Sequence, residues 1–244
     1  MNWKKFLFLI LFLSFNIQTA FSQETVIRKK SDIIKLVIDP GGKVVKLRNS
    51  YIFIPDRYQY DAKIDFESVF VFLHNKKEIK PFLEKVKSYA NAKALFLILP
   101  YSQKDYFTVS DMGVLKTLIN KVFKIFPQIS RKYSFFIGVG IGSFTALKLV
   151  ESYNFEVKNI SLCAFYLDKF KKLFFGLHLM KTKNLKVHIL NSKYGKKLNN
   201  DELMHLKEYF SKYRVQVTYD VVDFKYDMYD ALFIKSLDCC ELGM

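Results

Sequence analysis

The sequence predicts an α/β protein: a mainly parallel sheet with an N-terminal antiparallel hairpin and helices on both faces. Apolar runs rich in Val, Ile and Phe alternate with helical patterns along nearly the whole chain. Half of the 244 residues are apolar, which is enough for the core of one full domain. The glycine-rich stretch 138–143 directly follows an apolar run and leads into a helical pattern, so it predicts a tight strand-to-helix turn.

The N-terminal residues have the pattern of an export signal. Lys4 and Lys5 precede an apolar stretch at 6–15, and Ala20-Phe21-Ser22 follows it. This stretch is shorter than the roughly 20 residues that span a bilayer, and small residues two apart suit signal peptidase. We therefore expect residues 1–22 to be a signal peptide and 23–244 a single domain without a transmembrane segment. The mature protein would lie in the periplasm, at the cell surface or outside the cell; the alternative is an uncleaved anchor.

The first elements are predicted to be strands of an antiparallel hairpin that enters the sheet. Their ranges are 33–38, 43–47 and 51–54, with a turn at Asp39-Pro40-Gly41-Gly42. A strand at 68–73, a helix at 78–90 and a strand at 94–99 follow.

The next predicted helix begins at Asp111, a candidate N-cap, and ends before Pro127. Its apolar face comprises Val114, Leu115, Leu118, Ile119, Val122 and Phe123. The strand 133–137 then enters the glycine-rich turn, and the helix 144–150 leaves it. Further strands are expected at 159–166, 186–190 and 215–222, with helices at 168–180, 201–213 and 227–237.

Several phrases in this order resemble the putative-esterase family of α/β-hydrolases, which includes feruloyl esterases, S-formylglutathione hydrolases and mycolyltransferases. The phrases are Tyr51-Ile52-Phe53-Ile54-Pro55, Phe72-Leu73-His74-Asn75, Gly138-Val139-Gly140-Ile141-Gly142, Ser192-Lys193-Tyr194 and Phe224-Lys225-Tyr226-Asp227-Met228. The resemblance runs from about Arg48 to Lys235 and implies an α/β-hydrolase fold. It also implies that His74, Asn75 and Ile141 are candidates for the oxyanion loop.

The same resemblance implies that the catalytic triad is absent. Gly140 stands at the position of the nucleophilic serine, Tyr226 at that of the histidine, and no carboxylate lies at Tyr194 or next to it. Triad chemistry needs a nucleophile, an imidazole base and an orienting carboxylate, and a phenol with a pKa of about 10 cannot replace the imidazole. We therefore predict no catalytic residues, and a binding or scaffolding protein rather than an enzyme.

Other functions compete with this prediction. A serine esterase could use unrecognised residues, of which Ser143 is a displaced candidate nucleophile, although packing at the helix start is its expected role. Asp227 is expected to cap the last helix rather than act as an acid. An envelope structural protein without a ligand pocket is a further alternative.

A dinucleotide site is a weaker alternative. Gly138, Gly140 and Ser143 approximate Gly-x-Gly-x-x-Gly, but that motif normally opens a domain, whereas several strands precede it here. We expect no cofactor.

The net charge of +16 favours anionic partners. Only five of the 39 cationic residues are arginine, the side chain that supplies bidentate phosphate and guanine contacts, so nucleic-acid binding is not expected. The expected partner is an anionic small molecule, a glycan or an envelope component. Lys76, Lys77, Lys193 and Lys225 follow predicted strands and would form the rim of an anion-binding pocket, with backbone N–H groups after Gly140 at its base.

Cysteine and histidine spacing predicts neither a disulfide framework nor a metal site. The three cysteines are Cys163, in an apolar strand pattern, and the adjacent Cys239 and Cys240. We expect buried thiols, while a bridge from Cys163 to the C-terminal pair remains possible. His178, His188 and His205 lack metal-ligand spacing and are expected to be structural.

Overall fold

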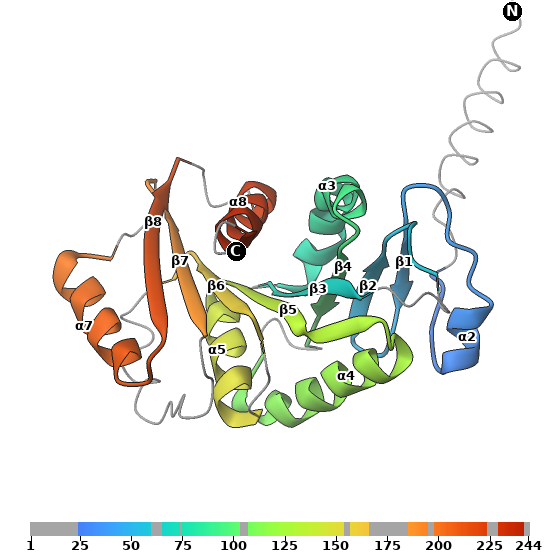
Figure 1. The fold of residues 1–244 in the computed structure, drawn as a ribbon, viewed down its shortest axis with the longest axis horizontal. Helices are drawn as coiled ribbons and strands as arrows, with labels where there is room; N and C mark the ends of the chain where they lie inside the picture. Colours follow the sequence, from blue (N-terminus) through green and yellow to red (C-terminus); the bar gives the residue numbers. More distant parts are fainter. Residues whose placement is uncertain are drawn as a thin grey trace, which may run out of the picture.

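A computed structural model describes residues 24–59, 65–73, 75–102, 107–153, 157–165, 185–194, 198–223 and 229–241. Their strands form one eight-stranded sheet in the order β1-β2-β4-β3-β5-β6-β7-β8 (Figure 1). β2 pairs antiparallel with both β1 and β4, and the remaining neighbours are parallel. The predicted fold class is therefore confirmed.

Most predicted elements occur within a few residues of their expected bounds. The strands are β1 Lys43–Lys46, β2 Ser50–Ile54, β3 Phe66–Phe72, β4 Phe96–Pro100, β5 Ile129–Val139, β6 Asn159–Cys163, β7 Lys186–Ser192 and β8 Gln216–Val222. The helices are α2 Lys30–Ile34, α3 Ile79–Ala92, α4 Met112–Ile125, α5 Ile141–Tyr153, α7 Asn200–Ser211 and α8 Tyr229–Glu241, with 3-10 turns at Lys76–Glu78 and Val109–Asp111. The helix expected at 168–180 lies outside the described residues.

Helices cover both faces of the sheet (Figure 1). α3 and α8 lie on one face, where the rings of Phe82 and Phe233 meet edge to face with centroids 5.3 Å apart. α4, α5 and α7 lie on the other face. Each face has its own apolar core, and β4 and β6 are buried along their whole length. Burial on both faces explains why the central strands appear in the sequence as continuous apolar runs.

Of the three ranges predicted for the antiparallel hairpin, 43–47 and 51–54 are confirmed as β1 and β2, and the first is wrong. The strand expected at 33–38 is absent, and residues 33 and 34 belong to α2. The Asp32 carboxylate stabilises the start of this helix by accepting hydrogen bonds from the N–H groups of Arg28 (2.8 Å) and Lys29 (3.1 Å). The turn at Gly41 and Gly42 instead leads into β1.

The true hairpin joins β1 to β2 through two residues, Arg48 and Asn49. Leu47 and Ser50 exchange backbone hydrogen bonds of 3.0 and 3.1 Å across this connection. Arg48 has a φ of 51°, in the left-handed region that side chains rarely adopt. Because β1 ends at the same side as the parallel strands, this connection lies at the carboxyl edge of the sheet, where those strands end.

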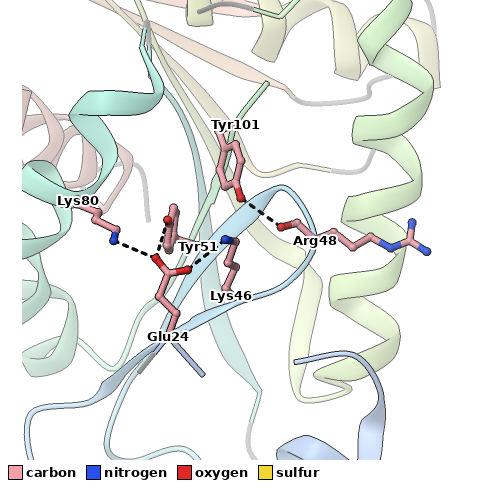
Figure 2. Close-up of polar contacts among 6 residues, drawn as sticks. All are labelled: Glu24, Lys46, Arg48, Tyr51, Lys80 and Tyr101. Carbon is pink, nitrogen blue, oxygen red and sulfur yellow. Dashed lines mark hydrogen bonds and ion pairs between the residues drawn. The ribbon is translucent and has the colours of Figure 1, made fainter. Parts of the chain in front are cut away.

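An ionic cluster attaches the N-terminal segment to the sheet edge (Figure 2). The Glu24 carboxylate accepts a hydrogen bond from the Tyr51 hydroxyl (3.0 Å) and forms ion pairs with Lys46 (3.1 Å) and Lys80 (2.9 Å). The hydrogen bonds from Lys80 and then Lys46 lower the pKa of Glu24 to about 2. Since Lys46 belongs to β1, Tyr51 to β2 and Lys80 to α3, the cluster connects three elements.

The junction between β5 and α5 is tightly packed. Gly140 connects them with a φ of 56°. A Cβ atom built on Gly142 would lie 1.9 Å from the carbonyl oxygen of Phe72, and one on Gly138 would lie 2.3 Å from the Cα of Ser143. β3, β5 and the first turn of α5 can approach this closely only because both positions lack a side chain.

The packing at this junction predicts a strong effect of Gly142→Ala. The added methyl group meets backbone atoms of β3, which cannot move without disturbing the sheet, so the free energy of unfolding should fall by about 3 kcal/mol. Gly113→Ala, at an exposed site in the first turn of α4, is the matched control and should raise stability by about 0.5 to 1 kcal/mol. Urea unfolding of both variants measures the difference, and equal stabilities would contradict the packing argument.

The Glu24 cluster predicts a pH dependence of stability. A lowered pKa means that Glu24 binds its proton less tightly in the folded state, so its contribution is present at neutral pH and is lost as the pH falls from about 4.5 towards about 2. Glu24→Gln should remove this acid-dependent loss. The difference should be about 1 kcal/mol or less, because the side chains are partly exposed. Glu208→Gln, on exposed α7 surface, is the control in urea unfolding from about pH 5 to pH 2.5; an equal effect there would refute the assignment.

Candidate functional site

The turn after β5 presents no nucleophilic side chain at its tip. Gly140 occupies the tip, and its N–H donates to the carbonyl of Cys163 on β6 (2.9 Å). The hydroxyl of Ser143 is fully buried and donates to the carbonyl oxygens of Gly138 (2.9 Å) and Cys163 (3.3 Å). Ser143 thus has the packing role expected at the start of the helix.

The oxyanion-loop candidates lie at the ends of two adjacent strands. β3 and β5 are neighbours, with Phe72 opposite Gly138. Ile141 begins α5 after β5, and Asn75 follows β3, where its side-chain oxygen accepts a hydrogen bond from the N–H of Lys77 (2.9 Å). The fold therefore brings Asn75 and Ile141 to the same edge, while His74 lies outside the described residues. Their oxyanion role stays a prediction.

A carboxylate lies near Tyr194, although the neighbouring sequence contains none. Tyr194 is 59% exposed after β7. Asp223, at the end of β8, forms an ion pair with Lys193, whose ammonium nitrogen is 5.0 Å from the centroid of the Tyr194 ring. The hydrogen bonds from Lys193 and then Tyr194 lower the pKa of Asp223. The sequence did not predict Asp223 as a neighbour of Tyr194, because only the pairing of β7 with β8 brings the two residues together.

Asp223 and Gly140 follow strands that are not neighbours in the sheet. β8 lies three strand spacings from β5, about 14 Å. The sequence-predicted positions Tyr226 and Asp227 lie outside the described residues.

The four lysines of the expected rim have different surroundings. The Lys76 ammonium nitrogen lies 4.6 Å from the centroid of the Tyr101 ring, and Lys77 follows it in the same 3-10 turn. The charge of Lys193 is balanced by Asp223, and Lys225 lies outside the described residues. The lysine rim stays a prediction. Of its described members, Lys193 adds the least positive charge to the edge, because Asp223 neutralises it.

A cavity of about 400 Å³ lies at the carboxyl edge, between the β1–β2 hairpin, the end of β4 and α4. It is lined by Arg48, Asn49, Tyr101, Ser102, Phe107, Asp111, Val114, Leu115 and Leu118. We call it the Arg48 cavity. The ring centroid of Phe107 lies 6.3 Å from that of Phe72, the last residue of β3. β3 is the neighbour of β5, but Gly140 is not part of the lining.

Sequence reasoning missed this cavity. It assigned Val114 to the buried face of its helix, whereas Val114 is 56% exposed. It also placed the hairpin turn at Gly41 and Gly42, so Arg48 did not emerge as a residue of the carboxyl edge. The short polar pair Arg48-Asn49 between two apolar runs was the signal that could have found it.

Two predicted structural residues are buried as expected. The sulfur of the buried Cys163 lies 3.2 Å from the hydroxyl oxygen of Ser236 on α8. Nδ1 of His188 lies 2.6 Å from the hydroxyl oxygen of Thr218, and burial lowers the pKa of this histidine. Within the described ranges, no three His, Cys, Asp or Glu side chains are grouped as metal ligands would be. Among the helices of those ranges, none is both long and apolar enough to cross a bilayer.

Comparisons with known proteins agree with the architecture. No family model and no curated protein matches the chain. Solved structures do: the fluorophosphonate-binding serine hydrolase FphF of Staphylococcus aureus has a TM-score of 0.56 at 13% identity, with 78% of this chain and 91% of that chain covered. An S-formylglutathione hydrolase of Agrobacterium tumefaciens also has a TM-score of 0.56, at 10% identity, with 85% and 97% covered.

A carboxylesterase of Bacillus cereus is similar to the same extent, with a TM-score of 0.54 at 13% identity over 80% of this chain and 94% of that chain. At such identities the likeness concerns the fold. Together with the strand order and the antiparallel β2, it shows that this chain has the α/β-hydrolase fold of esterase-like proteins.

Proposed function

We propose that this protein is an exported, non-catalytic binding protein that uses the α/β-hydrolase fold without its triad. The observation that carries the proposal is Gly140 at the tip of the β5–α5 turn. In α/β-hydrolases this turn lifts a serine Oγ above the sheet. Glycine offers no oxygen there, and its φ of 56° is free of the strain that a serine would experience.

The surroundings of Gly140 also support a non-catalytic role. Ser143, the nearest hydroxyl along the chain, is buried and donates its proton to backbone carbonyls. Asp223 is engaged by Lys193 at the far side of the edge.

The Arg48 cavity favours ligand binding over a purely structural role. Its volume of about 400 Å³ lies in the range of small-molecule sites, which is roughly 300 to 1,000 Å³. It also lies where open α/β sheets bind their ligands, outside the carboxyl ends of the strands. The esterase likeness of the fold keeps a serine hydrolase as the second candidate function.

The non-catalytic proposal predicts no reaction with serine-directed reagents. A fluorophosphonate probe should leave the protein unlabelled in intact-mass measurements, and p-nitrophenyl esters should not turn over above a control with residues 138–143 scrambled. FphF, described as fluorophosphonate-binding, serves as the positive control. Stoichiometric labelling of Ser143 would overturn the proposal and establish the hydrolase alternative.

The export part of the proposal predicts the mature N-terminus. Because the apolar stretch 6–15 is short and Ala20-Phe21-Ser22 follows it, cleavage should leave Gln23 as the first residue. Mass spectrometry of the native protein from the fraction outside the cytoplasm measures this directly. Recovery of an intact form beginning at Met1 from the inner membrane would refute it.

A further inference from the structure

The Arg48 cavity combines an apolar floor with a polar rim. Phe107, Leu115 and Leu118 supply the floor, and the exposed side chain of Val114 extends it to the surface of α4. Arg48, Asn49 and Ser102 supply polar groups at the hairpin and the end of β4. A cavity of this composition suits a ligand with one apolar and one polar end.

Arg48 is held at the rim by backbone contacts. The Tyr101 hydroxyl donates to the carbonyl oxygen of Arg48 (3.4 Å), and the Tyr101 N–H donates to that of Asn49 (2.8 Å). The Arg48 side chain extends away from the Glu24 cluster (Figure 2). With a φ of 51°, Arg48 occupies the first position of a two-residue hairpin, where glycine, asparagine or aspartate is usual.

Two described lysines outside the lining, Lys121 and Lys76, lie near residues that line the cavity. Burial, and then the charge of Arg48, lower the pKa of Lys121 on α4, so these two cations are close enough to interact. Lys76 lies over the ring of Tyr101, another lining residue. Among the described residues of the lining, the one carboxylate is that of Asp111, whose Oδ2 already accepts hydrogen bonds from the N–H (2.7 Å) and the hydroxyl (2.8 Å) of Thr108.

We propose that the Arg48 cavity binds a single-chain amphiphile with an anionic head, with the carboxylate or phosphate head at Arg48 and the apolar chain against Phe107 and Leu115. A guanidinium presents paired N–H donors that match either head group. This inference rests on the proposed binding function and names the class of ligand.

Calorimetric titration of purified protein with dodecanoate, dodecyl phosphate and dodecanol tests the proposal. At least one of the two anions should bind about tenfold more tightly than dodecanol, because the charge-assisted contacts to Arg48 are lost with the alcohol. The tighter of the two anions identifies the head group. The proposal would be overturned if dodecanol bound as tightly as both anions, or if neither anion bound.

Two glycine substitutions distinguish the effect of the Arg48 side chain on binding from the effect of its backbone conformation. Arg48→Gly should weaken binding of the preferred anion about tenfold while leaving stability equal or higher, because glycine accepts a positive φ. Arg214→Gly is the matched control, since Arg214 is also exposed and has a φ of 56°, but lies between α7 and β8. Equal loss of binding in both variants would mean that only the net charge of the protein affects binding, and it would refute the site.

A further pair of variants tests the apolar part. Val114→Trp should obstruct the cavity and weaken binding, whereas Val37→Trp, at a 73% exposed site outside the lining, should not. Equal binding by the two tryptophan variants would contradict the location. Fluorophosphonate labelling is independent of these titrations. Labelling would refute the proposed non-catalytic function, whereas failure of the titrations would refute only the proposed ligand class.

Discussion

The backbone contact between Gly142 and the carbonyl of Phe72 determines the geometry of the carboxyl edge. It holds the first turn of α5 against the end of β3, while β5 pairs with β3 in the register that sets Phe72 opposite Gly138. These are contacts between main chains, so they do not depend on the residue at the tip of the turn. The hydrolase-like turn is consequently a packing feature, and its shape is compatible with glycine at position 140.

The described charged residues of this edge have different partners on its two sides. On the β8 side, Lys193 is neutralised by Asp223. On the hairpin side, the rings of Tyr51 and Tyr101 lie 5.5 Å apart, with lysines above both of them. Glu24 balances Lys46 and Lys80 there, but its contacts do not extend to Arg48 (Figure 2). Among the described residues of this edge, Arg48 and Lys76 place positive charge beside the end of β4, where an anion would be attracted.

The parallel part of the fold could be predicted because burial on both faces produces continuous apolar runs. The same signal failed at 33–38, where an apolar segment forms α2 and coil; the capping by Asp32 is a local hydrogen-bond effect that periodicity does not register. The contact between Asp223 and the Lys193–Tyr194 pair depends on the register of β7 against β8, which no local pattern specifies. The exposure of Val114 likewise depends on how α4 sits against the sheet.

Three other described non-glycine residues have left-handed backbone, of which two end helices and the third, Ala164, follows β6. Ala94 and Arg214 follow helices, and the next residues close those helices with hydrogen bonds from Leu95 to Ala90 (2.9 Å) and from Val215 to Phe210 (3.1 Å). This is the usual arrangement of a helix C-terminus, in which the left-handed residue is needed for capping. Arg48 caps no helix, and glycine would satisfy the same hairpin bonds without a cost of about 1 to 2 kcal/mol. The backbone therefore gives no reason for arginine at this position, whereas the proposed contact between its side chain and an anionic head group would give one.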